Sequence, residues 1–170
     1  MPLFYPDYFY RRIYDIPTEF FLSQGIRAVL IDVDNTLTTH NNPVPHERML
    51  EWLDLQRQAG IGLLAFSNND EERVAPFACG LGLGHVSRAA KPLPFRLRQS
   101  LKEMGVRPDQ AAVIGDQVFT DILCARLAGC TAVLVEPMEP EGTRFFAFKR
   151  RWEKRVLRRY KPKTWEKKEG

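Results

Sequence analysis

Two aspartates follow directly after an apolar run in the segment AVLIDVDNTLTTH, residues 28–40. Residues 28–31 are typical of a buried strand, and Asp32 and Asp34 stand at its end. An ionised carboxylate at the end of a buried strand is costly unless a nearby charge of opposite sign offsets it. The chemistry of this segment therefore depends on what the rest of the chain places beside the two carboxylates.

Other polar side chains stand at the ends of the remaining predicted strands. Because ligands of an open parallel sheet bind at the carboxyl ends of its strands, these side chains should converge on one edge. Gathered carboxylates repel each other unless a divalent cation neutralises them, and ligands that are all oxygen suit Mg²⁺. A lysine and a hydroxyl beside such a cation suit a phosphate. A bound metal ion and an anionic substrate would then together balance the charges at this edge. The residues are Ser67, Asn68 and Asn69 after 61–66, Lys91 after a weak strand, Asp116 after 111–115, and Asp121 in the first turn of the next helix.

Apolar runs that alternate with helical segments predict the elements that position these residues. Strands that are apolar throughout and alternate with helices are typical of a parallel sheet covered on both faces. The expected fold class is therefore α/β, with a doubly wound, Rossmann-like parallel sheet. Thr18 could cap the first helix and Gly25 could end it. Strands are expected at 27–31, 61–66, 111–115 and 131–135, with a weak one within 80–87, and helices at 17–25, 45–59, 70–78, 94–105 and 120–129.

Four segments resemble the motifs of the haloacid dehalogenase superfamily of phosphotransferases. They are DVDNT (32–36), SNN (67–69), KP (91–92) and GDQVFTD (115–121), and their order and strand context match that superfamily. The likeness in fold covers about residues 26–136. The whole chain, with its aromatic N-terminus, is similar to the subfamily IIIA branch, which holds the YqeG-like bacterial proteins and phosphatidylglycerophosphate phosphatases.

The resemblance implies a role for each motif residue in a Mg²⁺-dependent phosphomonoester hydrolase. Asp32 resembles the nucleophile that forms an aspartyl-phosphate. Asp34 resembles the general acid that protonates the leaving oxygen and then activates water. The other implied roles are Ser67, Asn68 and Lys91 in binding the substrate phosphate, Asp32, Asp116 and the backbone carbonyl of Asp34 in binding Mg²⁺, and Thr36 and Asp121 in supporting the site.

The lengths of two connections bear on the substrate. Only about eight residues, 37–44, precede the second helix, and the stretch between Ser67 and Lys91 holds one helix and a short strand. Neither leaves room for a large cap domain, so the site should be open and suited to a large substrate. The expected substrate is phosphatidylglycerophosphate or a similar phospholipid. The alternatives are a phosphatase of soluble sugar phosphates or nucleotides, closed by oligomerisation, and a nucleic-acid- or ribosome-binding module with residual phosphatase activity.

The charge of the chain is unevenly distributed along its length. Residues 143–170 hold 12 Lys and Arg against 3 Glu, whereas the remainder holds 13 basic and 18 acidic residues. We divide the chain into an N-terminal aromatic arm with a short helix (1–25), a catalytic core (26–142) and a basic C-terminal helix or tail (143–170). The tail has apolar residues at helical spacing, so it could pack on the body, bind an anionic membrane or bind nucleic acid. We favour lipid.

Composition limits the location of the protein. No apolar run approaches the roughly 18 residues that a membrane-spanning helix needs, and the N-terminus lacks a basic start followed by an apolar stretch. Cys79, Cys124 and Cys130 form no metal-type pair, and we interpret them as reduced core thiols. The expected location is the cytoplasm, with peripheral membrane contact through the tail. The oligomeric state stays open at this point.

Overall fold

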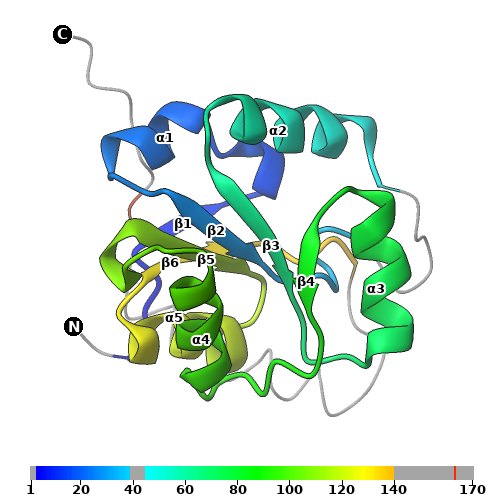
Figure 1. Cartoon of the computed structure of the whole chain (residues 1–170). Coiled ribbons are helices and arrows are strands. Elements are labelled where there is room, and N and C mark those ends of the chain that lie inside the picture. Colours follow the sequence, from blue (N-terminus) through cyan, green and yellow to red (C-terminus); the bar gives the residue numbers. More distant parts are fainter. Residues whose placement is uncertain (1–2, 39–44, 140–162, 164–170) are drawn as a thin grey trace, which may run out of the picture.

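The computed structural model describes residues 3–38, 45–139 and 163, and the statements below concern this part of the chain. Its strands form one parallel sheet in the order β1-β6-β5-β2-β3-β4 (Figure 1). The chain moves outward from β2 through β3 to β4 and then returns to β5 on the other side of β2. The expected α/β parallel sheet is therefore confirmed. The strands are Tyr8–Tyr10 (β1), Ala28–Ile31 (β2), Gly62–Phe66 (β3), Gly84–Val86 (β4), Ala111–Gly115 (β5) and Thr131–Val135 (β6).

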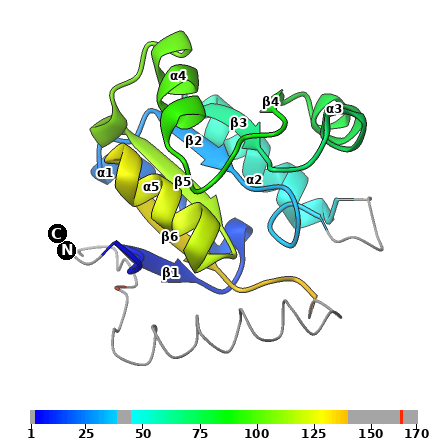
Figure 2. The same ribbon diagram turned by 90° about the horizontal axis from the view of Figure 1, so that it is seen from below.

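Helices cover both faces of this sheet (Figures 1 and 2). Val29 and Ile31 belong to a core cluster that includes Trp52 of α2, whereas Ala28 and Leu30 belong to a second cluster on the opposite face. Successive strand residues point to opposite faces, so a strand covered on both sides must be apolar at every position. One face carries α1 (Thr18–Ser23), α2 (Glu47–Gln58) and α3 (Glu71–Gly80), and the other carries α4 (Phe95–Glu103) and α5 (Leu123–Ala128).

Three short helical turns complete the described elements. Two are 3₁₀ turns, and the third is a π-helical turn that leads directly into α5. The single helix predicted over 120–129 is thus divided into a wide turn and a short α-helix. No helix in the described ranges is long and apolar enough to cross a membrane. The three turns are Ile13–Asp15 (η1), Pro108–Gln110 (η2) and Val118–Ile122 (η3).

The aromatic N-terminus supplies an edge strand that the sequence did not reveal. β1 pairs in parallel with β6, with Tyr8 opposite Val133, so residues predicted to form an arm extend the sheet. The predicted cap of α1 is wrong, because Thr18 is already helical and Pro17 occupies the N-cap position. Gly25 follows α1 with a φ of 68°, a conformation that glycine adopts readily and that ends the helix as expected.

The C-terminal tail falls almost entirely outside the described residues. Within it the structure describes Lys163, whose backbone carbonyl accepts a hydrogen bond from the Phe9 N–H at 3.2 Å. The helix predicted for residues 143–170 therefore stays a prediction.

The three cysteines differ in their environment. All are free, and Cys124 and Cys130 are buried, as expected. Cys79 is exposed on α3, so its assignment to the core is wrong. The reason is helical geometry: Ala78 supplies the buried position of this turn, and the next side chain along the helix points to solvent.

We predict selective alkylation of Cys79. Burial raises the pKa of the Cys124 and Cys130 thiols to about 12 each, so at pH 8 both lack the reactive thiolate. Intact-mass analysis after iodoacetamide treatment should show one adduct on the folded chain and three on the chain unfolded in denaturant. Folded Cys79→Ser should take up none. Labelling of Cys124 or Cys130 in the folded protein as fast as Cys79 would contradict the assignment.

Candidate active site

Three buried carboxylates meet at the carboxyl ends of the two central strands. Asp32 follows β2, Asp116 follows its neighbour β5, and Asp121 lies in the turn η3. Each offers a carboxylate oxygen, and these oxygens lie within 4.8 Å of one another. Because β2 and β5 are adjacent but their following segments diverge, this edge is the place where an open sheet leaves room for a ligand.

Lys91 brings a positive charge into this carboxylate cluster. Its Nζ lies 2.6 Å from Oδ1 of Asp32 and 2.7 Å from Oδ1 of Asp121, and the lysine side chain is only 4 % exposed. Burial alone would lower the pKa of Lys91, but Asp121 and Asp32 outweigh it and raise that pKa, so the ammonium stays charged. Lys91 thus supplies part of the positive charge that compensates the Asp32 carboxylate at the end of the apolar strand β2.

For Asp32, the candidate nucleophile, burial shifts the pKa upward, whereas for Lys91 it acts downward. It raises the pKa of Asp32 well above the ordinary value, with Lys91 opposing the shift and the carboxylates of Asp121 and Asp116 adding to it. When all four groups are ionised, three carboxylates face one ammonium. In that state the cluster carries a net negative charge that a further cation would offset.

Asp121 owes its position to the glycine that ends β5. Its Oδ2 accepts a hydrogen bond from the Gln117 N–H at 3.1 Å, which closes the wide turn η3. A Cβ atom on Gly115 would lie 2.3 Å from Cγ and Oδ2 of Asp121, far inside van der Waals contact. The first residue of the GDQVFTD segment is therefore glycine because a carboxylate occupies the space of its side chain.

The residues after β3 lie beside Lys91. Ser67 is buried, and its Oγ accepts the Asn69 N–H at 3.1 Å. Asn68 directs its amide group to the backbone of Lys91: Nδ2 donates to the carbonyl oxygen at 3.0 Å, and Oδ1 accepts the N–H at 2.8 Å. Asn68, expected to bind phosphate, thus holds the segment that carries the lysine.

Asp34 is not one of the three clustered carboxylates and has partners of its own. Its two carboxylate oxygens contact Nδ2 of Asn69 and the guanidinium of Arg73 on α3. Asn35, with a φ of 60°, turns the chain after Asp34, and Thr36 is buried behind it. The two partners hold Asp34 at the mouth of the site.

Sequence reasoning missed Arg73. A signal was available, because Arg73 lies in the first turn of α3, where the helix dipole disfavours a positive charge. A basic residue at that place indicates a partner outside the helix, and the partner is Asp34.

A divalent cation fits the carboxylate cluster by charge and by donor type. Carboxylate oxygens are the ligands that Mg²⁺ prefers, and the cluster holds three of them in a small buried space. Lys91 offsets one of the three charges, and Arg73 separately balances Asp34. The residues present are thus able to hold a 2+ ion beside Asp32.

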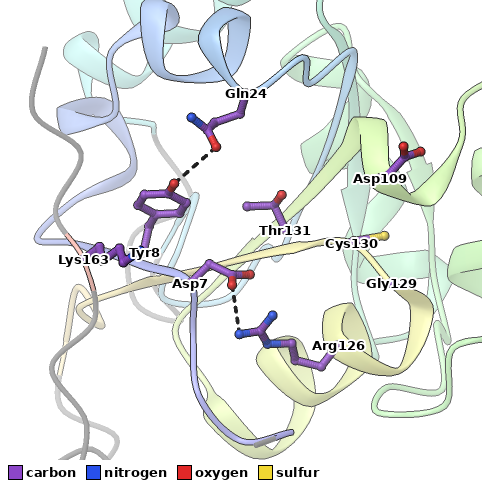
Figure 3. Close-up of a pocket in the computed structure, with 9 residues that line it drawn as sticks. All are labelled: Asp7, Tyr8, Gln24, Asp109, Arg126, Gly129, Cys130, Thr131 and Lys163. Atoms are coloured by element: carbon purple, nitrogen blue, oxygen red, sulfur yellow. Dashed lines mark hydrogen bonds and ion pairs between the residues drawn. The ribbon is translucent and has the colours of Figure 1, made fainter. Parts of the chain in front are cut away.

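A cavity lies at the amino ends of β1 and β6, away from the carboxyl ends that carry the aspartates (Figure 3). It has a volume of about 330 Å³ and is surrounded by residues at the starts of β1 and β6, such as Tyr8 and Thr131. Arg126 of α5 forms an ion pair with Asp7 at 2.9 Å and donates a hydrogen bond to the Tyr5 carbonyl, so these contacts fasten the N-terminal segment to the body. The walls of the cavity are formed by Asp7, Tyr8, Gln24, Asp109, Arg126, Gly129, Cys130, Thr131 and Lys163.

Comparisons with known proteins relate the chain to HAD-type hydrolases and phosphatases. The HAD-hydrolase-like family matches residues 88–137. A probable phosphatase YqeG from Bacillus subtilis is 31 % identical over 160 residues, which are 94 % of this chain and 93 % of that protein. A phosphoserine phosphatase from Thermus thermophilus is 33 % identical over 100 residues, which are 51 % of this chain and 40 % of that protein.

Solved structures agree on the fold. The cobalt-bound deoxy-D-mannose-octulosonate 8-phosphate phosphatase from Haemophilus influenzae superposes with a TM-score of 0.54 at 18 % identity, over 79 % of this chain and 89 % of that one. The chain therefore belongs to the haloacid dehalogenase (HAD) superfamily. It is a phosphatase of that superfamily, and the part of the chain that the structure describes contains no cap domain.

Replacing Gly115 with alanine should disable the site. The added methyl would push the Asp121 carboxylate, and with it Lys91, away from Asp32. A displacement of about 1 Å at reacting groups costs on the order of 100-fold in rate, and we expect that loss in kcat/KM for p-nitrophenyl phosphate. Far-UV circular dichroism and thermal unfolding would establish that the variant is folded. Unchanged kcat/KM in folded Gly115→Ala would show that this contact does not set the geometry of the site.

Proposed function

We propose that this phosphatase is a Mg²⁺-dependent phosphomonoesterase that works through an aspartyl-phosphate on Asp32 and acts on a phospholipid such as phosphatidylglycerophosphate. The observation that supports the chemistry is the buried ammonium of Lys91 between Asp32 and Asp121, with Asp116 beside them. A phosphate dianion next to a bare carboxylate would be repelled. The lysine and a bound cation would let the two anions approach.

The proposed reaction has two half-reactions at phosphorus. In the first, Oδ2 of Asp32 attacks phosphorus, the bond to the leaving oxygen breaks, and Asp34 gives that oxygen its proton. In the second, Asp34 takes a proton from water, the water oxygen attacks phosphorus, and inorganic phosphate leaves as the Asp32 carboxylate is restored. A Mg²⁺ ion held by Asp32, Asp116 and the backbone carbonyl of Asp34 would neutralise charge on the transferring phosphoryl group.

The surrounding residues have supporting roles in this proposal. Lys91 and the hydroxyl of Ser67 bind phosphate oxygens. Ser67 is suited to this because its Oγ already accepts the Asn69 N–H, which leaves its proton for donation. Asn68 holds the Lys91 backbone, and Asp121 orients the ammonium. Thr36 steadies the turn after Asp34 from its buried position.

Two features support a phospholipid substrate. The connection between β3 and β4 holds α3 but no cap domain, so a bulky head group would reach the carboxylate cluster. The basic residues of 143–170 would attract an anionic membrane surface, and each lysine or arginine contributes about 1 kcal/mol near such a surface. We propose a cytoplasmic enzyme in peripheral contact with the membrane.

Substitution of the two motif aspartates tests the chemistry. Asp32→Asn should abolish phosphate release from p-nitrophenyl phosphate, because an amide is a poor nucleophile. Asp34→Asn should slow release by a factor of ~10² to 10⁴, the usual contribution of a general acid or base. Excess EDTA should abolish the phosphatase activity of the wild type, and added Mg²⁺ should restore that activity. A near-normal rate for Asp32→Asn would refute the assignment of Asp32 as nucleophile. A near-normal rate of the wild type in excess chelator would refute the requirement for a metal ion.

A substrate panel tests the phospholipid assignment. We expect the highest kcat/KM for phosphatidylglycerophosphate in phosphatidylglycerol vesicles, above soluble sugar phosphates and nucleotides. The wild type should sediment with these vesicles at near-physiological salt. A second protein tests the basic tail: it should not sediment, but should keep its activity on p-nitrophenyl phosphate. It carries the substitutions Arg150→Glu, Arg151→Glu, Arg155→Glu, Arg158→Glu and Arg159→Glu. Faster turnover of a soluble phosphate would favour a soluble substrate, and RNA binding without vesicle binding would favour a nucleic-acid partner.

A further inference from the structure

An apolar groove lies between α2 and α3 on the face of the sheet that carries these helices. It has a volume of about 480 Å³. Its wall includes Leu50, which is 44 % exposed on α2, and Phe77 on α3. The residues that define this α2–α3 groove are Pro45, Leu50, Glu72, Arg73, Pro76, Phe77, Gly80 and Leu81.

One residue links the groove to the candidate active site. Arg73 lines the groove and also contacts the Asp34 carboxylate with its guanidinium. In the proposed reaction Asp34 protonates the leaving oxygen, so that oxygen must lie beside Asp34. A carbon chain that continues from the leaving oxygen would then pass Arg73 and reach the groove, while the phosphate would lie beside Lys91 and Asp32.

We propose that the α2–α3 groove binds the aliphatic part of the substrate's leaving alcohol. This inference rests on the proposed phosphatase reaction and adds a specificity site to it. The two charged side chains of the groove, Glu72 and Arg73, are adjacent in the first turn of α3, and Arg73 contacts Asp34; the other side chains of the wall, such as Leu50 and Phe77, are apolar. Such an order fits an amphiphilic phosphomonoester that is polar near the ester oxygen and aliphatic beyond it.

A series of ethyl, butyl and octyl phosphate, each below its micelle concentration, measures the contribution of the groove. Transfer of a methylene group from water to an apolar site favours binding by up to about fourfold. We therefore expect kcat/KM of the wild type to rise at least ~10-fold from ethyl to octyl phosphate. Equal values along the series would overturn the groove assignment while leaving the phosphatase reaction intact. Absence of hydrolysis of every ester, p-nitrophenyl phosphate included, would instead refute the proposed function itself.

Two leucines of α2 provide a matched pair of variants. Leu50 lines the groove, whereas Leu55 is 54 % exposed on the same helix and does not line it. Leu50→Asp should reduce the octyl-to-ethyl ratio of kcat/KM at least ~10-fold, because the new carboxylate would need to be desolvated against the chain. Leu55→Asp should leave both that ratio and the activity unchanged. Thermal unfolding would establish that both variants are folded.

Two outcomes would overturn the assignment at this stage. One is an equal octyl-to-ethyl ratio in the two variants. The other is a wild-type dimer that Leu50→Asp converts to a monomer in analytical ultracentrifugation with the ratio unchanged, which would make the groove an interface between two copies of the chain.

Discussion

The architecture of the site depends on a buried ammonium that holds two carboxylates at the end of an apolar strand. Lys91 reaches Asp32 and Asp121 from a different segment of the chain, and all three side chains are almost entirely buried. Each charge would be unstable alone in this environment, because removing one partner leaves the others uncompensated. The strands, the wide turn after β5 and the Asn68 contacts to the Lys91 backbone all fix the distances within this group.

The motif residues could be placed from sequence because their positions follow from topology. Parallel strands that are apolar throughout end at one edge, so Asp32 and Asp116 were expected at the same edge, and the structure adds that β2 and β5 are neighbours there. The direction of a side chain is a different matter. Nothing in the spacing indicates that Asp34 turns toward α3 or that Asn68 binds backbone, because both depend on the tertiary approach of segments distant in sequence.

Other features could not be predicted, because they rest on very short segments or on partners distant in the sequence. β1 has three residues, too few for a hydrophobic period to be distinguished from an aromatic-rich coil, and its pairing with β6 is entirely non-local. Cys79 is apolar enough to be assigned to a core, yet its side chain lies one helical position beyond the buried face of α3. Arg73 is the most instructive case, since it is unfavourable within its own helix and becomes favourable only beside Asp34.

The parallel pairing of β1 with β6 has a consequence for the order in which the chain folds. Tyr8 is made before Val133, which it faces in the sheet and which emerges 125 residues later. Contacts of such high sequence separation form slowly, because a long loop must close before any pairing is gained. During translation the aromatic side chains of β1 therefore stay exposed until β6 has been made. Of the strands that the structure describes, β1 is made first and is paired last.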